Sequence, residues 1–325
     1  MQIGQDEHRA ALGVDIGGTK IAAGVVDAGG RIVRRAEVPT PRGADAIDRA
    51  TADLCLSLAA THPVEAVGIA VAGLVSSDRE TVMFAPNIHY RNHPIAARVR
   101  ALLDDAMPVV VENDANAAGW AEFAHGGHGA SDMLMLTIGT GVGGAIVADG
   151  RLLRGGCGAG AEVGHLQIVA EGEECGCGQR GCFEAYASGT ALERHGVRAV
   201  EDRAPGAERL TELAHADGGL RGRHIAQAAA EGDAFALGLL DDLGEWIGRG
   251  AASLVAVVDP DVIVIGGGVA STGAPLFAGI ERGLRRHLTG ADHRPFPRIV
   301  PATFGNEAGI LGAADLARAA VLTPA

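Results

Sequence analysis

Two similar stretches occur in the chain, IGGTKIAAGVVDAGGRIV at residues 16–33 and IGTGVGGAIVADGRLL at residues 138–153. Each copy begins at the end of an apolar run, at residues 11–16 and 134–138, and continues with a glycine turn and a second apolar run, to residues 26 and 148. This pattern predicts a β-hairpin. A hairpin unit that recurs about 120 residues further on predicts two homologous α/β halves. The alternative is that glycine-rich strands resemble each other through composition alone.

The segments between and after the hairpins predict helices that alternate with strands. This alternation predicts an α/β fold with a mainly parallel sheet in each half. Helical spacing or composition marks residues 44–60, 94–103, 114–123, 187–257 and 305–320, and short apolar runs mark strands at 109–111 and 262–265.

Composition excludes several classes of protein. The net charge of −13 disfavours non-specific nucleic-acid binding, which needs a basic surface. No run reaches the ~18 apolar residues of a membrane helix. The first ten residues, MQIGQDEHRA, lack the apolar core of a secretory signal. We therefore expect a cytoplasmic protein with neither a membrane nor a nucleic-acid partner.

One histidine and three of the five cysteines lie close together in the sequence, at His165, Cys175, Cys177 and Cys182. Zinc prefers four such nitrogen and sulfur ligands in a tetrahedron. A disulfide between Cys175 and Cys177 is the alternative, but a one-residue gap would strain it. The pattern predicts a structural zinc site, and Glu162 and Glu184 beside it suggest that the metal supports a binding site.

Two glycine loops have the composition of phosphate-binding turns. The loop GTGVGG at 139–144 matches the dinucleotide pattern GxGxxG, but a strand follows it where that pattern needs a helix. The loop DIGGTK at 15–20 lacks the first glycine of a Walker loop, and it holds Lys20, the only lysine of the chain. Both loops are predicted to be hairpin turns whose backbone amides cradle a phosphate.

The stretch ENDANAA at 112–118 directly follows a predicted strand and begins a predicted helix. Asp114 would then lie at a helix N-terminus, where the helix dipole favours its ionised form. An ordinary N-cap is an equally good explanation from spacing alone.

These motifs together resemble the ROK family of sugar kinases, and most closely the ATP-dependent glucokinases of actinobacteria. The resemblance covers essentially the whole chain. Its motifs are DIGGTK at 15–20, FAPN at 84–87, ENDANAA at 112–118, GTGVGG at 139–144, GAGAEVGH at 158–165, CGCGQRGCFE at 175–184 and VIGGG at 264–268.

The resemblance implies an actin-like (ribonuclease H-like) kinase with a duplicated core and an interdomain cleft for sugar and ATP. The implied domains are residues 1–115 with 306–325, and residues 116–305. It also implies structural Zn²⁺, Mg²⁺ with ATP, and a homodimer or homotetramer.

By the same resemblance Asp114 is the general base toward the sugar 6-hydroxyl. The implied sugar-binding residues are Gly73, Asn87, His89, Asn113, Asp114, Glu162, His165 and Glu184. The implied ATP- and phosphate-binding residues are Asp15, Gly17, Gly18, Thr19, Lys20, Thr140, Gly141, Gly266, Gly267 and Gly268. The implied zinc ligands are His165, Cys175, Cys177 and Cys182.

Two positions depart from the family pattern. Ala72-Gly73 replaces the Pro-Gly of many relatives. After Asn87 this chain has Ile-His89-Tyr90, where those glucokinases usually have a tryptophan and no histidine. An imidazole beside the sugar would suit an amine, so kanosamine (3-amino-3-deoxyglucose) is the alternative to glucose. An N-acetylhexosamine kinase and a sugar-responsive regulator are more distant alternatives.

Overall fold

The computed structural model describes residues 10–105 and 107–322, which divide into two compact units. The first unit is built from the chain up to Gly129, from Ala145–Ala161 and from Thr303 onward. The second unit is built from Ala130–Gly144 and Glu162–Ala302. Each unit is therefore assembled from stretches that are separated in the sequence.

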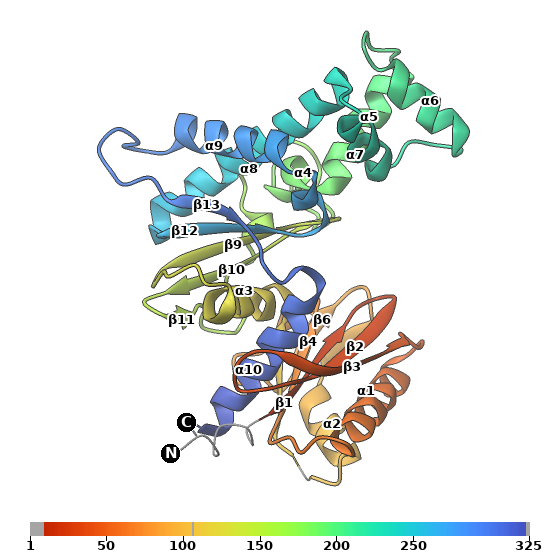
Figure 1. Ribbon diagram of the computed structural model, residues 1–325, viewed down its shortest axis with the longest axis vertical. Coiled ribbons are helices and arrows are strands. Elements are labelled where there is room, and N and C mark those ends of the chain that lie inside the picture. Colours follow the sequence, from red (N-terminus) through yellow and green to blue (C-terminus); the bar gives the residue numbers. More distant parts are fainter. Residues whose placement is uncertain (1–9, 106, 323–325) are drawn as a thin grey trace. The chain divides into compact units, whose positions relative to one another are not determined.

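The first unit contains a five-stranded sheet in the order β3-β2-β1-β4-β8. Strands β1 to β4 of this sheet are labelled in Figure 1. Strand β1 pairs antiparallel with β2 and parallel with β4, and β4 pairs parallel with β8. The strands are β1 (Ala11–Ile16), β2 (Lys20–Val26), β3 (Ile32–Pro39), β4 (Val67–Val71) and β8 (Val109–Asn113). The predicted hairpin at 11–26 is therefore present as β1 and β2.

Helices cover both faces of this sheet. Alternate residues of β1, such as Leu12 and Val14, pack in one buried cluster with α1 (Ala44–Ala59) and α2 (Ile95–Leu102). Ala11 packs in another cluster with α3 (Asp114–His125) and α10 (Ala308–Leu322). This alternation follows from the two-residue period of a strand.

Helix α10 touches the sheet backbone directly. A Cβ atom on Gly13 would lie 1.8 Å from the Ile310 carbonyl oxygen, and one on Gly68 would lie 1.9 Å from that of Ala313. Only glycine allows so close an approach of helix and strand. On the other side of α10, a Cβ atom on Gly312 would lie 1.7 Å from the carbonyl oxygen of Ala117 in α3.

A small sheet in the order β5-β6-β7 also belongs to the first unit. Its antiparallel strands are β5 (Leu74–Val75), β6 (Val82–Ala85) and β7 (Tyr90–His93). The sequence did not predict this sheet.

The second five-stranded sheet has the order β11-β10-β9-β12-β13, which repeats the pattern of the first. Strand β12 pairs parallel with β9 and with β13. The strands are β9 (Met133–Ile138), β10 (Val142–Ala148), β11 (Arg151–Leu152), β12 (Val262–Gly266) and β13 (Arg298–Pro301). The matching orders agree with the duplication that the repeated stretch predicts.

The helices of the second unit lie mostly between β11 and β12 in the sequence, in the region predicted to be helical. They are α4 (Glu184–Ala187), α5 (Gly189–Glu201), α6 (Glu208–Ala216), α7 (Gly222–Ala230), α8 (Ala234–Val258) and α9 (Ala274–His287), with short 3₁₀ turns η1 (Val163–His165) and η2 (Gly268–Thr272). A third 3₁₀ turn, η3 (Gly305–Glu307), precedes α10 in the first unit.

The division into units differs from the implied domains at residues 115 and 305. Helix α3 lies in the first unit, because its backbone packs against α10 at Gly312. Residues 145–161 also belong to the first unit. Among the described residues, none of the helices combines the length and the apolar composition that a bilayer-spanning helix needs.

Candidate functional site

The junction of β8 and α3 places Asp114 at the first position of a helix. Asn113 is the N-cap, and its Oδ1 accepts a hydrogen bond from the Asn116 backbone N–H at 3.0 Å. Its Nδ2 donates to the carbonyl oxygen of Gly73 at 3.1 Å. Asp114 accepts from the Ala115 backbone N–H, and burial raises the pKa of its carboxyl group. The junction therefore joins Gly73, Asn113 and Asp114 in one place.

The first glycine turn lies beside this junction. Asp15 is the last residue but one of the hairpin strand β1, and its pKa is raised to about 6, first by burial and second by the negative charge of Asp114. Lys20 opposes this shift, and its ammonium group pairs with Glu37 at 3.1 Å. The turn is closed by a hydrogen bond from the Gly17 N–H to the Lys20 carbonyl at 3.0 Å. Gly18, Thr19 and Lys20 are exposed at this turn.

The turn between β6 and β7 brings Asn87 to the same region. A Cβ atom on Gly18 would lie 3.7 Å from the Cβ atom of Asn87. The start of β7 is anchored inside the unit, because the Tyr90 hydroxyl donates to the buried carboxylate of Asp48 at 3.0 Å. His89 is exposed and has a φ of 59°, an uncommon value for a residue other than glycine.

In the second unit, the loop between β9 and β10 is held by the start of α5. The Gly189 N–H donates to the Gly139 carbonyl at 2.7 Å, and the Thr190 hydroxyl donates to the Thr140 carbonyl at 2.7 Å. These bonds leave Thr140 exposed at the tip of the loop.

Glu184 also touches this loop. Its Oε2 accepts a hydrogen bond from the Val142 N–H at 2.9 Å, and a Cβ atom on Gly141 would lie 2.2 Å from the same oxygen. A predicted sugar-binding residue and a predicted phosphate-binding loop are thus in direct contact.

The glycines after β12 approach the end of β9. Gly267 has a φ of 84°, and a Cβ atom there would lie 2.4 Å from the Ile138 carbonyl oxygen. Gly189, which bonds the loop at Gly139, also lies against Val269. The predicted nucleotide-binding glycines Gly266 to Gly268 are therefore close to the loop that holds Thr140.

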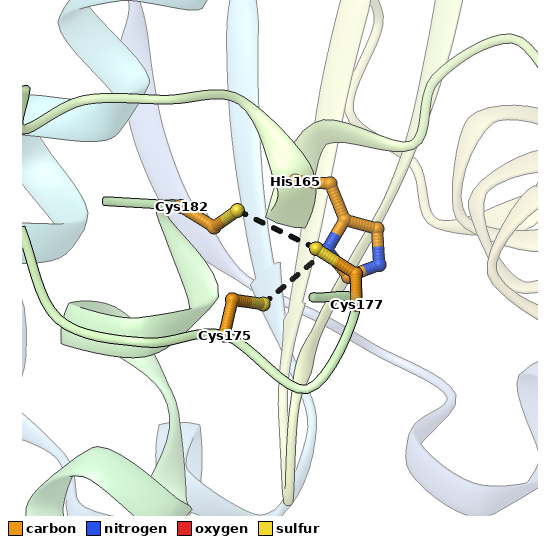
Figure 2. Close-up of side chains that lie close together, drawn as sticks. All are labelled: His165, Cys175, Cys177 and Cys182. Atoms are coloured by element: carbon orange, nitrogen blue, oxygen red, sulfur yellow. Dashed lines mark hydrogen bonds between the residues drawn. The ribbon is translucent and has the colours of Figure 1, made fainter. Parts of the chain in front are cut away.

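Figure 2 shows the four predicted zinc ligands turned toward one point. The ligand atoms of His165, Cys175, Cys177 and Cys182 all lie within 4.8 Å of one another. The Sγ atoms of Cys177 and Cys182 are 3.7 Å apart, as are Cys175 Sγ and His165 Nδ1. Tetrahedral zinc with bonds of about 2.3 Å sets its sulfur ligands about 3.8 Å apart. The donor set and its spacing therefore fit zinc.

This histidine and cysteine cluster is continuous with the predicted sugar-binding residues of its unit. Cys175 Sγ lies 3.8 Å from Glu184 Oε1. The Glu162 carbonyl accepts a hydrogen bond from the His165 N–H at 3.1 Å, which closes the short turn η1 between them.

The predicted site residues therefore form two groups, one in each unit. The first group is Asp15, Gly17, Gly18, Thr19, Lys20, Gly73, Asn87, His89, Asn113 and Asp114, and the second is Thr140, Gly141, Glu162, His165, Cys175, Cys177, Cys182, Glu184, Gly266, Gly267 and Gly268.

The anchors of these residues were not predicted from the sequence. Asp48 is fully buried and receives bonds from Tyr90 and His93 of β7, about forty residues away. Glu112, which precedes Asn113 in the sequence, is buried. Its place within the ENDANAA motif was the one local signal of its importance.

Comparison with known proteins agrees with the family resemblance. Residues 11–320 match the ROK family. A glucokinase of Streptomyces coelicolor is 44% identical over 94% of this chain and 97% of its own length.

Two solved structures are similar over nearly their whole length. A ROK family glucokinase from Streptomyces griseus, in complex with glucose and AMPPNP, has a TM-score of 0.84 and 44% identity, covering 95% of this chain and 99% of its own. A ROK hexokinase from Thermus thermophilus has a TM-score of 0.81 and 36% identity, covering 96% and 99%. The predicted actin-like α/β fold class is confirmed.

Proposed function

Because the chain belongs to the ROK family, we propose that it is an ATP-dependent kinase that phosphorylates the 6-hydroxyl group of glucose. The observation that carries this proposal is the likeness to the Streptomyces griseus glucokinase, which was solved with glucose and an ATP analogue. Identity of 44% over nearly the full length of both chains supports a shared reaction.

We assign the role of general base to Asp114. Its carboxyl group is held at a helix start, and burial raises its pKa, which strengthens the carboxylate as a proton acceptor. Phosphoryl transfer through a loose transition state needs alignment and charge neutralisation more than a strong base. A carboxylate within hydrogen-bond reach of the hydroxyl is therefore sufficient.

The remaining predicted residues divide by chemistry. Asn87, Asn113, Glu162, His165 and Glu184, with the backbone near Gly73, offer the hydrogen-bond donors and acceptors that a hexose requires. The turns at Gly17 to Lys20 and at Thr140-Gly141 offer backbone amides for phosphates, and Asp15 offers a carboxylate beside them. Mg²⁺ accompanies ATP and neutralises phosphate charge when bound.

Zinc would be held by His165, Cys175, Cys177 and Cys182, where its role is to fix the loop beside Glu162 and Glu184. We further propose a cytoplasmic enzyme that forms a homodimer or homotetramer, with no nucleic-acid or membrane partner. The net charge of −13 supports the absence of a nucleic-acid partner.

Steady-state kinetics of ADP release test the substrate. Glucose is expected to give the highest kcat/KM among glucose, kanosamine, mannose, N-acetylglucosamine and N-acetylmannosamine. Kanosamine is the main competing substrate in this panel, because the exposed His89 follows Asn87 in the predicted sugar-binding turn. A higher kcat/KM for any other sugar would replace glucose as the substrate.

Asp114→Asn tests the catalytic assignment. The substitution preserves the size of the side chain and its position at the start of α3, so glucose binding should persist. We expect kcat to fall by about 10²–10⁴-fold, the usual weight of general base catalysis. A variant that keeps a third of the wild-type kcat would refute the role of Asp114.

A further inference from the structure

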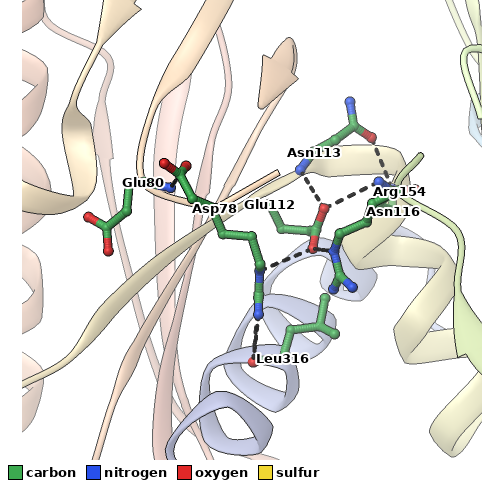
Figure 3. Close-up of polar contacts among 8 residues, drawn as sticks. Asp78, Glu80, Glu112, Asn113, Asn116, Arg154 and Leu316 are labelled. Carbon is green, nitrogen blue, oxygen red and sulfur yellow. Dashed lines mark hydrogen bonds and ion pairs between the residues drawn. The ribbon is translucent and has the colours of Figure 1, made fainter. Parts of the chain in front are cut away.

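Glu112 precedes Asn113 in strand β8, and its carboxylate is buried, with only 3% of the residue's surface exposed. Figure 3 shows it between Asn113, Asn116 and Arg154. Its Oε1 accepts from the Asn113 backbone N–H and from the Asn116 side-chain amide, each at 3.2 Å. Both bonds go to residues on either side of Asp114.

Two arginines lie at the other oxygen of this carboxylate and neutralise its negative charge. Arg154 donates from Nε to Glu112 Oε2 at 2.8 Å, and Arg79 Nε lies 3.5 Å from the same oxygen. Arg79 comes from the turn between β5 and β6, whereas Arg154 follows β11. The negative charge beside Asp114 is thus neutralised by residues from two distant segments of the first unit.

The two arginines are themselves held in place. Arg79 has a φ of 61°, and its guanidinium group also donates to the Leu316 carbonyl of α10 at 3.4 Å. The Arg154 carbonyl accepts from the Gly160 N–H at 2.8 Å. A strained residue that places a buried guanidinium group is typical of a functional site.

Stability alone gives a weak reason for such an arrangement. Replacing buried ion pairs with apolar residues of similar volume is often neutral or stabilising, because the charges lose their hydration. The arrangement does fix the geometry of this junction, since Glu112 binds Asn113 and Asn116 on either side of Asp114, while Asn113 binds Gly73.

We propose that Glu112, held by Arg154 and Arg79, is a positioning residue that orients Asp114 toward the sugar hydroxyl. Glu112 acts through Asn113 and Asn116 and has no contact with the reacting atoms in this role. The inference rests on the proposed function, in which Asp114 accepts the proton of the sugar 6-hydroxyl group.

Glu112→Gln tests this role with little change in volume. The amide retains an oxygen for Asn113 and Asn116 but removes the charge that holds both arginines. Misplacing a catalytic group by about 1 Å costs up to about 10²-fold in rate. We therefore expect kcat to fall by about 10- to 100-fold while KM for glucose and ATP stays within about threefold, because alignment acts mainly in the transition state.

Arg154→Met should give a similar fall in kcat, and Arg154→Lys should restore part of it. The double variant Glu112→Gln with Arg154→Met should lose less than the product of the two single losses, since both changes break one network. Because Arg154 is 27% exposed in its side chain, its variant serves if Glu112→Gln does not fold.

Glu80→Gln is the matched control. Glu80 is the neighbour of Arg79, and it pairs with Arg100 at 2.9 Å. This variant removes a carboxylate charge of the same kind from the same turn. It should keep kcat within about twofold of the wild type, as surface ion pairs contribute little.

The outcomes separate this inference from the proposed function. An inactive wild type, or an active Asp114→Asn variant, would overturn the proposed function. If both behave as expected but folded Glu112→Gln and Arg154→Met keep more than a third of kcat, the positioning role is overturned. A rise in KM with kcat unchanged overturns it as well.

Discussion

At the scale of single residues, Asp15 and Asp114 lie close enough for the charge of one to raise the pKa of the other. The folded protein therefore holds the proton on Asp15 more tightly than the unfolded chain does. Its pKa is about 6 in the fold against 3.8 for an ordinary aspartate. Because the folded state binds more protons in this interval, the free energy of unfolding decreases as the pH rises from about 4 to about 6.

Asp15→Asn should therefore stabilise the unliganded protein at neutral pH. A shift of about two pKa units corresponds to up to about 3 kcal/mol. We expect equal stability of variant and wild type near pH 4, and a more stable variant at pH 7.5. Urea unfolding at both pH values, without nucleotide or Mg²⁺, measures the difference. A variant that is less stable than the wild type at pH 7.5 would contradict this reading of Asp15.

At the scale of secondary-structure elements, glycines set the contact between α8 and α9. A Cβ atom on Gly248 would lie 2.2 Å from the Ile280 carbonyl oxygen, and one on Gly279 would lie 2.3 Å from that of Asp241. Both obstacles are backbone atoms, which cannot move without shifting a helix. The helices can approach each other this closely only with glycine at these positions.

Gly248→Ala should destabilise the protein by about 1–3 kcal/mol, the usual cost of forcing extra volume into a packed contact. Gly238→Ala in the same helix is the control, because its Cβ atom would meet nothing within 4 Å. Alanine there should be neutral or stabilising by about 0.5–1 kcal/mol, since it favours the helix. Thermal unfolding of both variants checks the prediction, and equal effects would disprove the contact.

The proposed zinc site gives a second prediction at this scale. Cys177→Ala should lose stoichiometric zinc and raise KM for glucose by about 10- to 100-fold, because the freed loop carries His165 and Glu162. Cys157→Ala, at an exposed cysteine outside the cluster, should change neither. Elemental analysis and kinetics on freshly purified protein make the comparison. Full activity in protein without zinc would exclude the metal from this role.

Local sequence patterns predicted the elements best. The apolar runs around the glycine turns became β1 with β2 and β9 with β10, and the helix expected from Asp114 became α3. The close spacing of Cys175, Cys177 and Cys182 also indicated that these cysteines cluster with His165. In each case the deciding residues are neighbours in the sequence.

Contacts between distant segments were not predictable in this way. Glu112 pairs with Arg79 and Arg154, and no local sequence pattern specifies that these three residues meet. The boundary expected at residue 115 differs from the division between the compact units at Gly129, because the packing of α3 on α10 joins residues nearly two hundred positions apart.

At the scale of the whole molecule, the two sheets have the same pattern of strand order. The units differ in which parts of the sequence supply their helices. The second unit gains its helices from one continuous stretch, Glu162–Ala302. The first unit receives α10 from the other end of the sequence. Duplication of the core therefore did not produce equivalent units.

The close seat of α10 on Gly13 and Gly68 has a consequence for synthesis in the cell. The strands β1 to β8 leave the ribosome early, as does α3, but α10, the second helix on this face of their sheet, is made only after the second unit. At about 5–20 residues per second, translation of the intervening stretch takes on the order of ten seconds or more. During that interval the face of the sheet at Gly13 and Gly68 lacks the helix that packs against it in the complete fold.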